Sequence, residues 1–217
     1  MAVSQRQLPL PLPEPPMRLG VLASGRGSNL RTLLERCADG SLDAEVVAVT
    51  CNHSDAPALK IAAEHGVPYL TALRAGYPSR LEQQRSIAAF LDRAGARLIV
   101  CAGWDRVLGN EIVERYAGRM INIHPSLLPA FAGGLHAVSD ALAYGVKVTG
   151  VTVHFVTSDL DAGPIILQEA VPVLPDDTLT SLSERIREVE HRLLPQAVQL
   201  FVERRLQVEG RLVTITE

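Results

Sequence analysis

The feature that most constrains the fold is an alternation between short β-rich runs and amphipathic stretches, which begins near residue 18. The β-rich runs lie at 19–23, 46–51, 68–70, 98–102 and 120–123. After the first run, four apolar residues spaced at i, i+3, i+4 and i+7 share one helical face: Leu30, Leu33, Leu34 and Cys37. Strands that alternate with helices are typical of a parallel sheet. The sequence therefore predicts an α/β fold with an open, twisted, mostly parallel sheet flanked by helices.

The later part of the chain predicts two further strands between two helices. A helix is expected over about 134–144, and the two β-branched runs that follow it, 148–155 and 165–173, are expected to extend the sheet. A long closing helix is expected to begin near residues 176–178, because Asp and Thr side chains there can cap free amides. Pro195 is expected to kink or divide this helix, since proline lacks an amide donor.

Length and composition predict one globular domain. The chain has 217 residues, 47% hydrophobic and 21% charged, which is enough to bury one large core. We expect this domain to span 17–217, after a disordered proline-rich tail at 1–16 that has no secretory-signal pattern. The longest apolar run, 98–104, is far shorter than the ~20 residues of a membrane-spanning helix. No membrane segment is therefore expected.

Charge and cysteine usage exclude several classes of function. The 21 basic and 24 acidic residues give a net charge of −3 with no basic stripe, so nucleic acid is not an expected partner. The cysteines Cys37, Cys51 and Cys101 form no Cys-x-x-Cys pair, which argues against disulfides and zinc and favours the cytoplasm. The lysines are Lys60 and Lys147, and so few argue against Schiff-base chemistry.

A glycine-rich loop joins the first strand to the first helix. Its sequence, Ser-Gly-Arg-Gly-Ser-Asn at 24–29, points backbone amides over a helix N-terminus, where an anion binds well. The third glycine of a dinucleotide fingerprint is absent, and so is an acidic residue after the second strand. No Gly-Lys-Ser/Thr follows either. The loop therefore predicts a site for a single phosphate on a small substrate, with a simple tight turn as the alternative.

Asn122, His124 and Asp161 form a candidate reacting cluster. Asn122 and His124 alternate at the C-terminal end of a predicted strand, where open parallel sheets bind ligands. An amide can donate to a developing oxyanion, an imidazole can act as acid or base, and a carboxylate can orient and charge that imidazole. Ser126 lies too close to His124 along the chain to serve as its nucleophile, and no Gly-x-Ser-x-Gly elbow occurs. The attacking atom is therefore expected to belong to a substrate, although His124 could instead be satisfied within a turn.

Several motifs together resemble the phosphoribosylglycinamide formyltransferases, folate-dependent members of the formyltransferase family. The motifs are the loop at 24–29, Ala-Gly-Trp at 102–104, Arg-Val-Leu at 106–108, Asn-Ile-His-Pro-Ser-Leu-Leu-Pro at 122–129, His-Phe-Val-Thr at 154–157 and Leu-Asp-Ala-Gly-Pro-Ile at 160–165. The resemblance covers about 17–217 and implies a Rossmann-like fold with a phosphate-binding N-terminal half and a folate-binding C-terminal half. It implies formyl transfer from the co-substrate 10-formyltetrahydrofolate to the amine of glycinamide ribonucleotide in de novo purine biosynthesis, without a metal.

The same resemblance implies a role for each matching residue. Asn122 and protonated His124 stabilise the tetrahedral oxygen, and Asp161 pairs with His124 and helps relay protons. Contacts to the acceptor phosphate and ribose fall to Gly27, Ser28, Asn29, Arg187 and Glu190. Folate contacts fall to Arg80, Asp105, Arg106, Val107, Leu108, Val113 and Asn122. Without the resemblance, Arg187 and Glu190 could equally be an ordinary i, i+3 surface pair.

Two departures from the family pattern bear on folate binding. Asp105 stands where the family usually has methionine, and residues 132–134 lengthen a turn by one residue just before the loop histidine His136. Two alternative functions stay open at this point: a formyltetrahydrofolate hydrolase, in which water attacks, and a catalytically inactive phosphate-metabolite binding protein. The sequence predicts small-molecule substrates and leaves the oligomeric state open.

Overall fold

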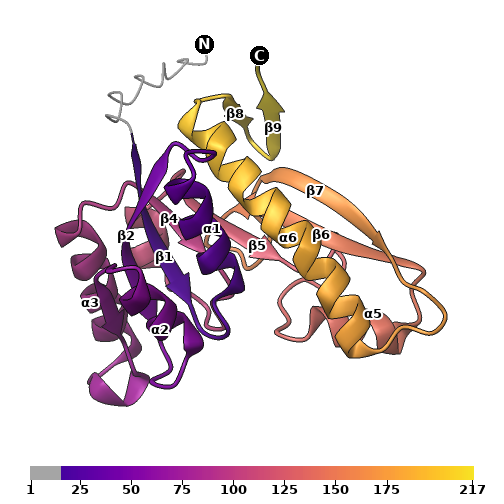
Figure 1. The fold of residues 1–217 in the computed structure, drawn as a ribbon, viewed down its shortest axis with the longest axis horizontal. Helices are drawn as coiled ribbons and strands as arrows, with labels where there is room; N and C mark the ends of the chain where they lie inside the picture. The colour runs from indigo at the N-terminus through magenta and orange to yellow at the C-terminus, as the bar shows by residue number, and fades with distance from the viewer. Residues whose placement is uncertain (1–15) are drawn as a thin grey trace, which may run out of the picture.

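A seven-stranded sheet forms the centre of the molecule, with strand order β3-β2-β1-β4-β5-β6-β7 (Figure 1). The computed structural model describes residues 16–217. The strands of the sheet are β1 (Met17–Ala23), β2 (Ala44–Cys51), β3 (Tyr69–Thr71), β4 (Leu98–Cys101), β5 (Met120–His124), β6 (Val148–Phe155) and β7 (Ile165–Pro172). The helices are α1 (Ser28–Ala38), α2 (Pro57–Glu64), α3 (Arg80–Arg93), α4 (Asn110–Arg115), α5 (Ala137–Tyr144) and α6 (Leu179–Val202), with a short 3₁₀ turn η1 (Arg74–Gly76).

The sheet is parallel from β3 to β5 and antiparallel from β5 to β7. This arrangement confirms the predicted α/β class with a mostly parallel sheet. It also confirms that the runs at 148–155 and 165–173 extend the sheet. The predicted tail at 1–16 lies outside the described residues except for Pro16, and the single-domain organisation stays a prediction.

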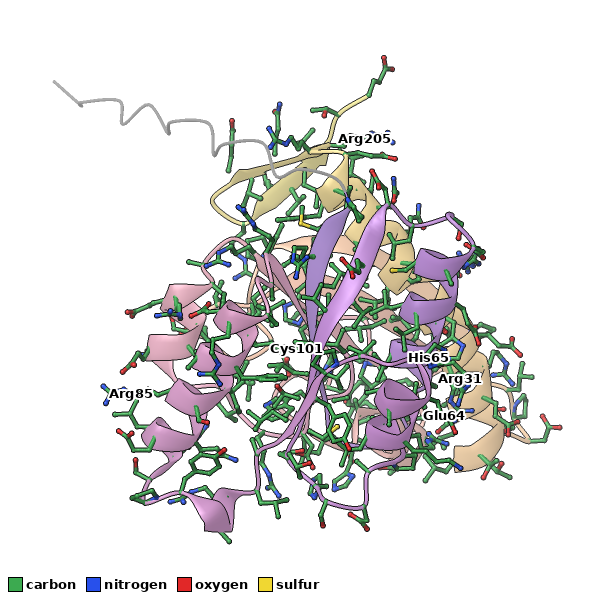
Figure 2. All side chains as sticks on the ribbon, turned by 60° about the vertical axis from the view of Figure 1, so that its left-hand side comes forward. Arg31, Glu64, His65, Arg85, Cys101 and Arg205 are labelled. Atoms are coloured by element: carbon green, nitrogen blue, oxygen red, sulfur yellow. The ribbon has the colours of Figure 1, made fainter. Side chains whose placement is uncertain are left out.

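Two apolar cores cover the two faces of the sheet. Leu19 and Val21 of β1 join the core made with α1, α2 and α6, while Leu22 joins the core made with α3 and α4. This alternation follows from the two-residue period of a strand. Helices therefore cover both faces of the sheet. Figure 2 shows this arrangement, with Arg31 on α1 and Arg85 on α3 on opposite sides of the sheet.

Helix α6 begins where the sequence predicts, but Pro195 does not divide it. Thr178 caps the helix by accepting a hydrogen bond from the Ser181 amide, in a capping box. The helix then continues unbroken from Leu179 to Val202, so the expectation of two separate helices is wrong. Pro195 removes one backbone donor, but buried apolar neighbours on both sides of it hold the helix against the core: Leu193, Leu194, Ala197 and Val198.

A β-hairpin that was not predicted from the sequence follows α6. Strands β8 (Leu206–Glu209) and β9 (Leu212–Ile215) pair antiparallel around the turn Gly210–Arg211. Leu206 and Val213 pack against the core on the α6 side. Figure 1 shows the hairpin beside the start of β7, although the two segments are far apart in the sequence. Within residues 16–217, no helix is long and apolar enough to cross a membrane.

Candidate active site

The predicted phosphate loop and the Asn-His pair lie at the same edge of the sheet. The loop follows β1, Asn122 and His124 end β5, and β4 lies between these two strands. All three strands are parallel, so their carboxyl ends face the same crevice. From the sequence, the loop and the Asn-His pair were expected to face one ligand only if their two strands lie near each other. The strand order places a single strand, β4, between them.

His124 and Asp161 form a buried pair. Nδ1 of His124 lies 3.6 Å from Oδ2 of Asp161, and the two side chains are 7% and 9% exposed. Asp161 comes from the loop between β6 and β7, where its backbone is left-handed with φ of 50°. Its carboxylate also accepts a hydrogen bond from the Gly133 amide at 2.8 Å. The carboxylate is thus held between two loops and directed at the imidazole.

His154 lies in the His-Phe-Val-Thr motif but was not predicted as a site residue. Its Nδ1–H donates to the Phe155 carbonyl at 2.9 Å, which leaves Nε2 as an acceptor for the Asn122 amide at 3.1 Å. Burial lowers the pKa of His154 and keeps the ring neutral, although Asp161 opposes the shift. The 3.8 Å gap from His154 Nε2 to Asp161 is too long for a hydrogen bond. One N–H of Asn122 is therefore fixed by His154, and the other is left to meet a ligand.

The second ring nitrogen of His124 faces the lengthened loop. Its Nε2–H donates to the Phe131 carbonyl at 3.0 Å, and Phe131 has a left-handed backbone with φ of 55°. Both nitrogens of His124 are thus engaged, one toward a carboxylate and one toward a carbonyl oxygen. An oxyanion in the place of that carbonyl oxygen would accept a hydrogen bond from the same Nε2–H.

The phosphate loop has the geometry that an anion site needs. Gly27 adopts φ of 72° at the N-cap of α1, and a Cβ there would come within 2.8 Å of Ala58 Cα. Only glycine therefore fits this position. The first backbone hydrogen bond of α1 runs from Arg31 to Gly27, so the amides of Ser28 and Asn29 precede it and are free to bind an anion.

Helix α6 closes the other side of this loop. Nδ2 of Asn29 donates to Glu190 at 3.1 Å, and burial raises the pKa of Glu190 while Asn29, Arg187 and Arg26 oppose the shift. The structure thus brings these acceptor-site candidates together. A groove of about 340 Å³ opens beside them, lined by Arg26, Ser28, Arg31, Thr32, Glu35, Pro57, Lys60, Ile61, Glu64 and His191. Figure 2 shows Arg31 and Glu64 on neighbouring helices at this groove.

Asp105 is held by hydrogen bonds to the neighbouring strand ends. Its carboxylate accepts hydrogen bonds from Asn52 at 2.6 Å and His53 at 2.8 Å, and its amide donates to Ser24 Oγ at 2.9 Å. Partial burial disfavours the charged carboxylate, but the hydrogen bonds from His53, Asn52 and Ser24 outweigh it and lower the pKa. Asp105, which departs from the family pattern, therefore links the phosphate loop, the end of β2 and the segment after β4.

The other predicted folate residues surround the segment 106–109. Arg80 and Gln84 of α3 both donate to the Val107 carbonyl, which fixes the backbone of this segment. Val107 is exposed and Leu108 half-buried, whereas Val113 is only 5% exposed and packs in the core. Val113 thus belongs to the core against which Leu108 packs, and Arg106 and Val107 lie exposed beside Leu108.

Comparisons with known proteins agree with the motifs. The family model described as formyl transferase matches residues 17–198. The chain is 47% identical over 203 residues to phosphoribosylglycinamide formyltransferase of Mycobacterium tuberculosis, covering 94% of this chain and 93% of that protein. It resembles the crystal structure of glycinamide ribonucleotide transformylase 1 from Symbiobacterium toebii, with TM-score 0.90, 46% identity and coverage of 93% and 94%. A formyltetrahydrofolate deformylase from Pseudomonas syringae is a more distant neighbour, with TM-score 0.85, 28% identity and coverage of 93% and 66%.

Proposed function

The chain belongs to the formyl transferase family, and we propose that it transfers the formyl group of 10-formyltetrahydrofolate to the amine of glycinamide ribonucleotide, a step of de novo purine biosynthesis. The observation that carries the proposal is the side-by-side arrangement of an anion loop and an Asn122, His124 and Asp161 cluster without an enzyme nucleophile. A phosphate-bearing substrate that supplies its own attacking amine fits both parts.

In the proposed reaction, the amine lone pair attacks the formyl carbon and negative charge develops on the formyl oxygen. The N–H of Asn122 that does not bind His154 donates to this oxygen, and so does Nε2–H of His124, which exchanges the Phe131 carbonyl for it. Asp161 balances the positive charge of the imidazole. The bond from the formyl carbon to the folate nitrogen then breaks, and the proton lost by the amine is returned to that nitrogen.

The acceptor is proposed to bind between α1 and α6. The amides of Ser28 and Asn29, with Gly27 shaping the turn, meet the phosphate, and Arg187 adds positive charge. Glu190, held by Asn29, lies on the same helix face one turn further and meets the ribose or amine. In the groove beside it, the basic residues Arg26, Arg31 and Lys60 outnumber the acidic residues Glu35 and Glu64, which favours an anion.

The folate is proposed to lie against the segment after β4. Arg106, exposed Val107 and half-buried Leu108 offer a cationic and apolar surface of the kind that a flat heteroaromatic ring requires. Arg80 and Asp105 support the backbone on either side of this surface, and Val113 belongs to the core against which Leu108 packs. We further propose that the reaction takes place in the cytoplasm, where the free cysteine thiols stay reduced.

The test follows 10-formyltetrahydrofolate consumption with glycinamide ribonucleotide, with its dephosphorylated analogue, and with no acceptor. Acceptor-dependent turnover is expected, with a much higher KM for the analogue. His124→Ala is expected to lose about 10²- to 10³-fold in kcat, because one oxyanion donor is removed. Consumption without any acceptor would instead favour the hydrolase, and phosphate binding without turnover would favour the inactive binding protein.

A further inference from the structure

The C-terminal hairpin contacts the loop that carries Asp161. Nη1 of Arg211, in the hairpin turn, donates to the Ala162 carbonyl at 2.7 Å. The two residues are 49 positions apart along the chain. Ala162 directly follows Asp161, so the peptide next to the proposed catalytic carboxylate is bonded to a distant element.

Few hydrogen bonds from other parts of the described chain reach this loop. Between residues 157 and 163, two hydrogen bonds from other parts of the described chain reach it: Gly133 to the Asp161 side chain, and Arg211 to the Ala162 backbone. Asp161 also has a left-handed backbone, which L-residues adopt at an energetic cost. An external bond to the following carbonyl offsets that cost and fixes the direction of the Asp161 side chain.

The hairpin is held at two places. Leu206 and Val213, both half-buried, pack against the core. At its open end, the Thr216 amide donates to the Arg205 carbonyl at 2.9 Å, and Nε of Arg205 donates to the Thr216 carbonyl at 2.7 Å. Figure 2 shows Arg205 at this end of the hairpin. Packing and these hydrogen bonds place the two strands of the hairpin, and the Arg211 side chain spans from the exposed turn to the loop.

We propose that Arg211 is a positioning residue, which holds the Asp161 loop so that the carboxylate faces His124. The inference rests on the proposed formyl transfer, because Asp161 matters only if His124 must carry charge during the reaction. Arg211 touches neither of these side chains and acts through the Ala162 carbonyl. Its loss should therefore affect the chemical step more than substrate binding.

The test compares Arg211→Ala, Arg211→Lys and Arg205→Ala in the full-length enzyme. Arg211→Ala is expected to lower kcat about three- to tenfold, the rate equivalent of one ordinary solvent-exposed hydrogen bond, with little change in either KM. Arg211→Lys is expected to recover part of the loss, because an ammonium can also donate to a carbonyl. Arg205→Ala removes one side-chain hydrogen bond at the open end of the hairpin, keeps the Thr216–Arg205 backbone bond and does not touch the loop, so it is the control for loosening of the hairpin.

A measurement without turnover separates positioning from general destabilisation. The ring ¹H–¹⁵N signals of His124 and His154 are expected to shift in Arg211→Ala and to stay in place in Arg205→Ala. Unchanged kcat and unchanged histidine signals in Arg211→Ala would overturn the proposal, and so would equal losses in both alanine variants. Wild-type enzyme without acceptor-dependent turnover would instead refute the proposed function, and in that case the histidine signals still test whether Arg211 orders the loop.

Discussion

The hydrogen bond from Asn122 to His154 predicts a measurable catalytic role for a histidine that touches no substrate. Replacing His154 with leucine keeps the side chain close in size and removes both ring nitrogens. Asn122 then loses the acceptor at 3.1 Å that fixes its amide. The free amide can rotate, so its other N–H no longer points reliably at the developing oxyanion.

The magnitude lies between two limits. Loss of one ordinary hydrogen bond costs about 1 kcal/mol, or roughly fivefold in rate, and loss of a whole oxyanion donor costs about 3 to 4 kcal/mol. We therefore expect His154→Leu to lower kcat about 10- to 100-fold. The variant also leaves the Phe155 carbonyl without its Nδ1–H donor, which costs about 1 to 3 kcal/mol of stability.

Steady-state kinetics of three variants test this reasoning. His154→Gln can still present an acceptor to Asn122, so it should retain more activity than His154→Leu. His136→Ala, which changes an exposed loop histidine, should behave like the wild type. A leucine variant that folds and keeps wild-type kcat would refute the claim that His154 orients Asn122.

Three further predictions concern stability and binding. Gly27→Ala should cost at least about 1 to 2 kcal/mol in urea unfolding and raise the KM for the acceptor, because φ is positive and Ala58 is too close. Asp105→Asn should cost less than about 1 kcal/mol at neutral pH, since the pair with His53 is about one-third exposed, and the loss should shrink in high salt. The lowered pKa of His154 means that the unfolded state binds more protons, so its contribution to stability is full above about pH 6.5 and is lost as the pH falls toward the folded pKa. Urea unfolding of wild type and His154→Leu between pH 5 and 8 measures that contribution.

Local patterns predicted much of the sheet and of the candidate site. The β-branched run at 148–155 became β6 with the same bounds, and the i, i+3, i+4 face of the first helix is buried as expected for its leucines. Such features depend on side chains within one element, which the sequence displays directly. The juxtaposition of His124 with Asp161 was also anticipated, because both residue types were needed for one chemistry.

Long-range contacts were harder to predict. The hairpin at 206–215 has a two-residue turn, but its role comes from Arg211 reaching a loop 49 residues earlier, which no local pattern reports. Pro195 was expected to kink or divide α6 because a proline lacks a donor; it does not divide the helix, and the packing that holds the helix together comes from other elements. The family resemblance placed Asp105 near the folate, whereas Asn52 and His53, the partners of its carboxylate, belong to another strand end.

The change from parallel to antiparallel pairing at β5 explains why His154 in particular could not be assigned from sequence. In an antiparallel pair, opposite residues have their side chains on the same face, and Asn122 lies opposite His154. A parallel β6 would have placed a different residue beside Asn122, and the His-Phe-Val-Thr motif gives no direction for its strand. The loop after β6 starts beside Met120 and then returns to bring Asp161 within 3.6 Å of His124. The candidate active site thus depends on a change of strand direction after the parallel strands end, which places His154 beside Asn122 and is followed by the loop that carries Asp161.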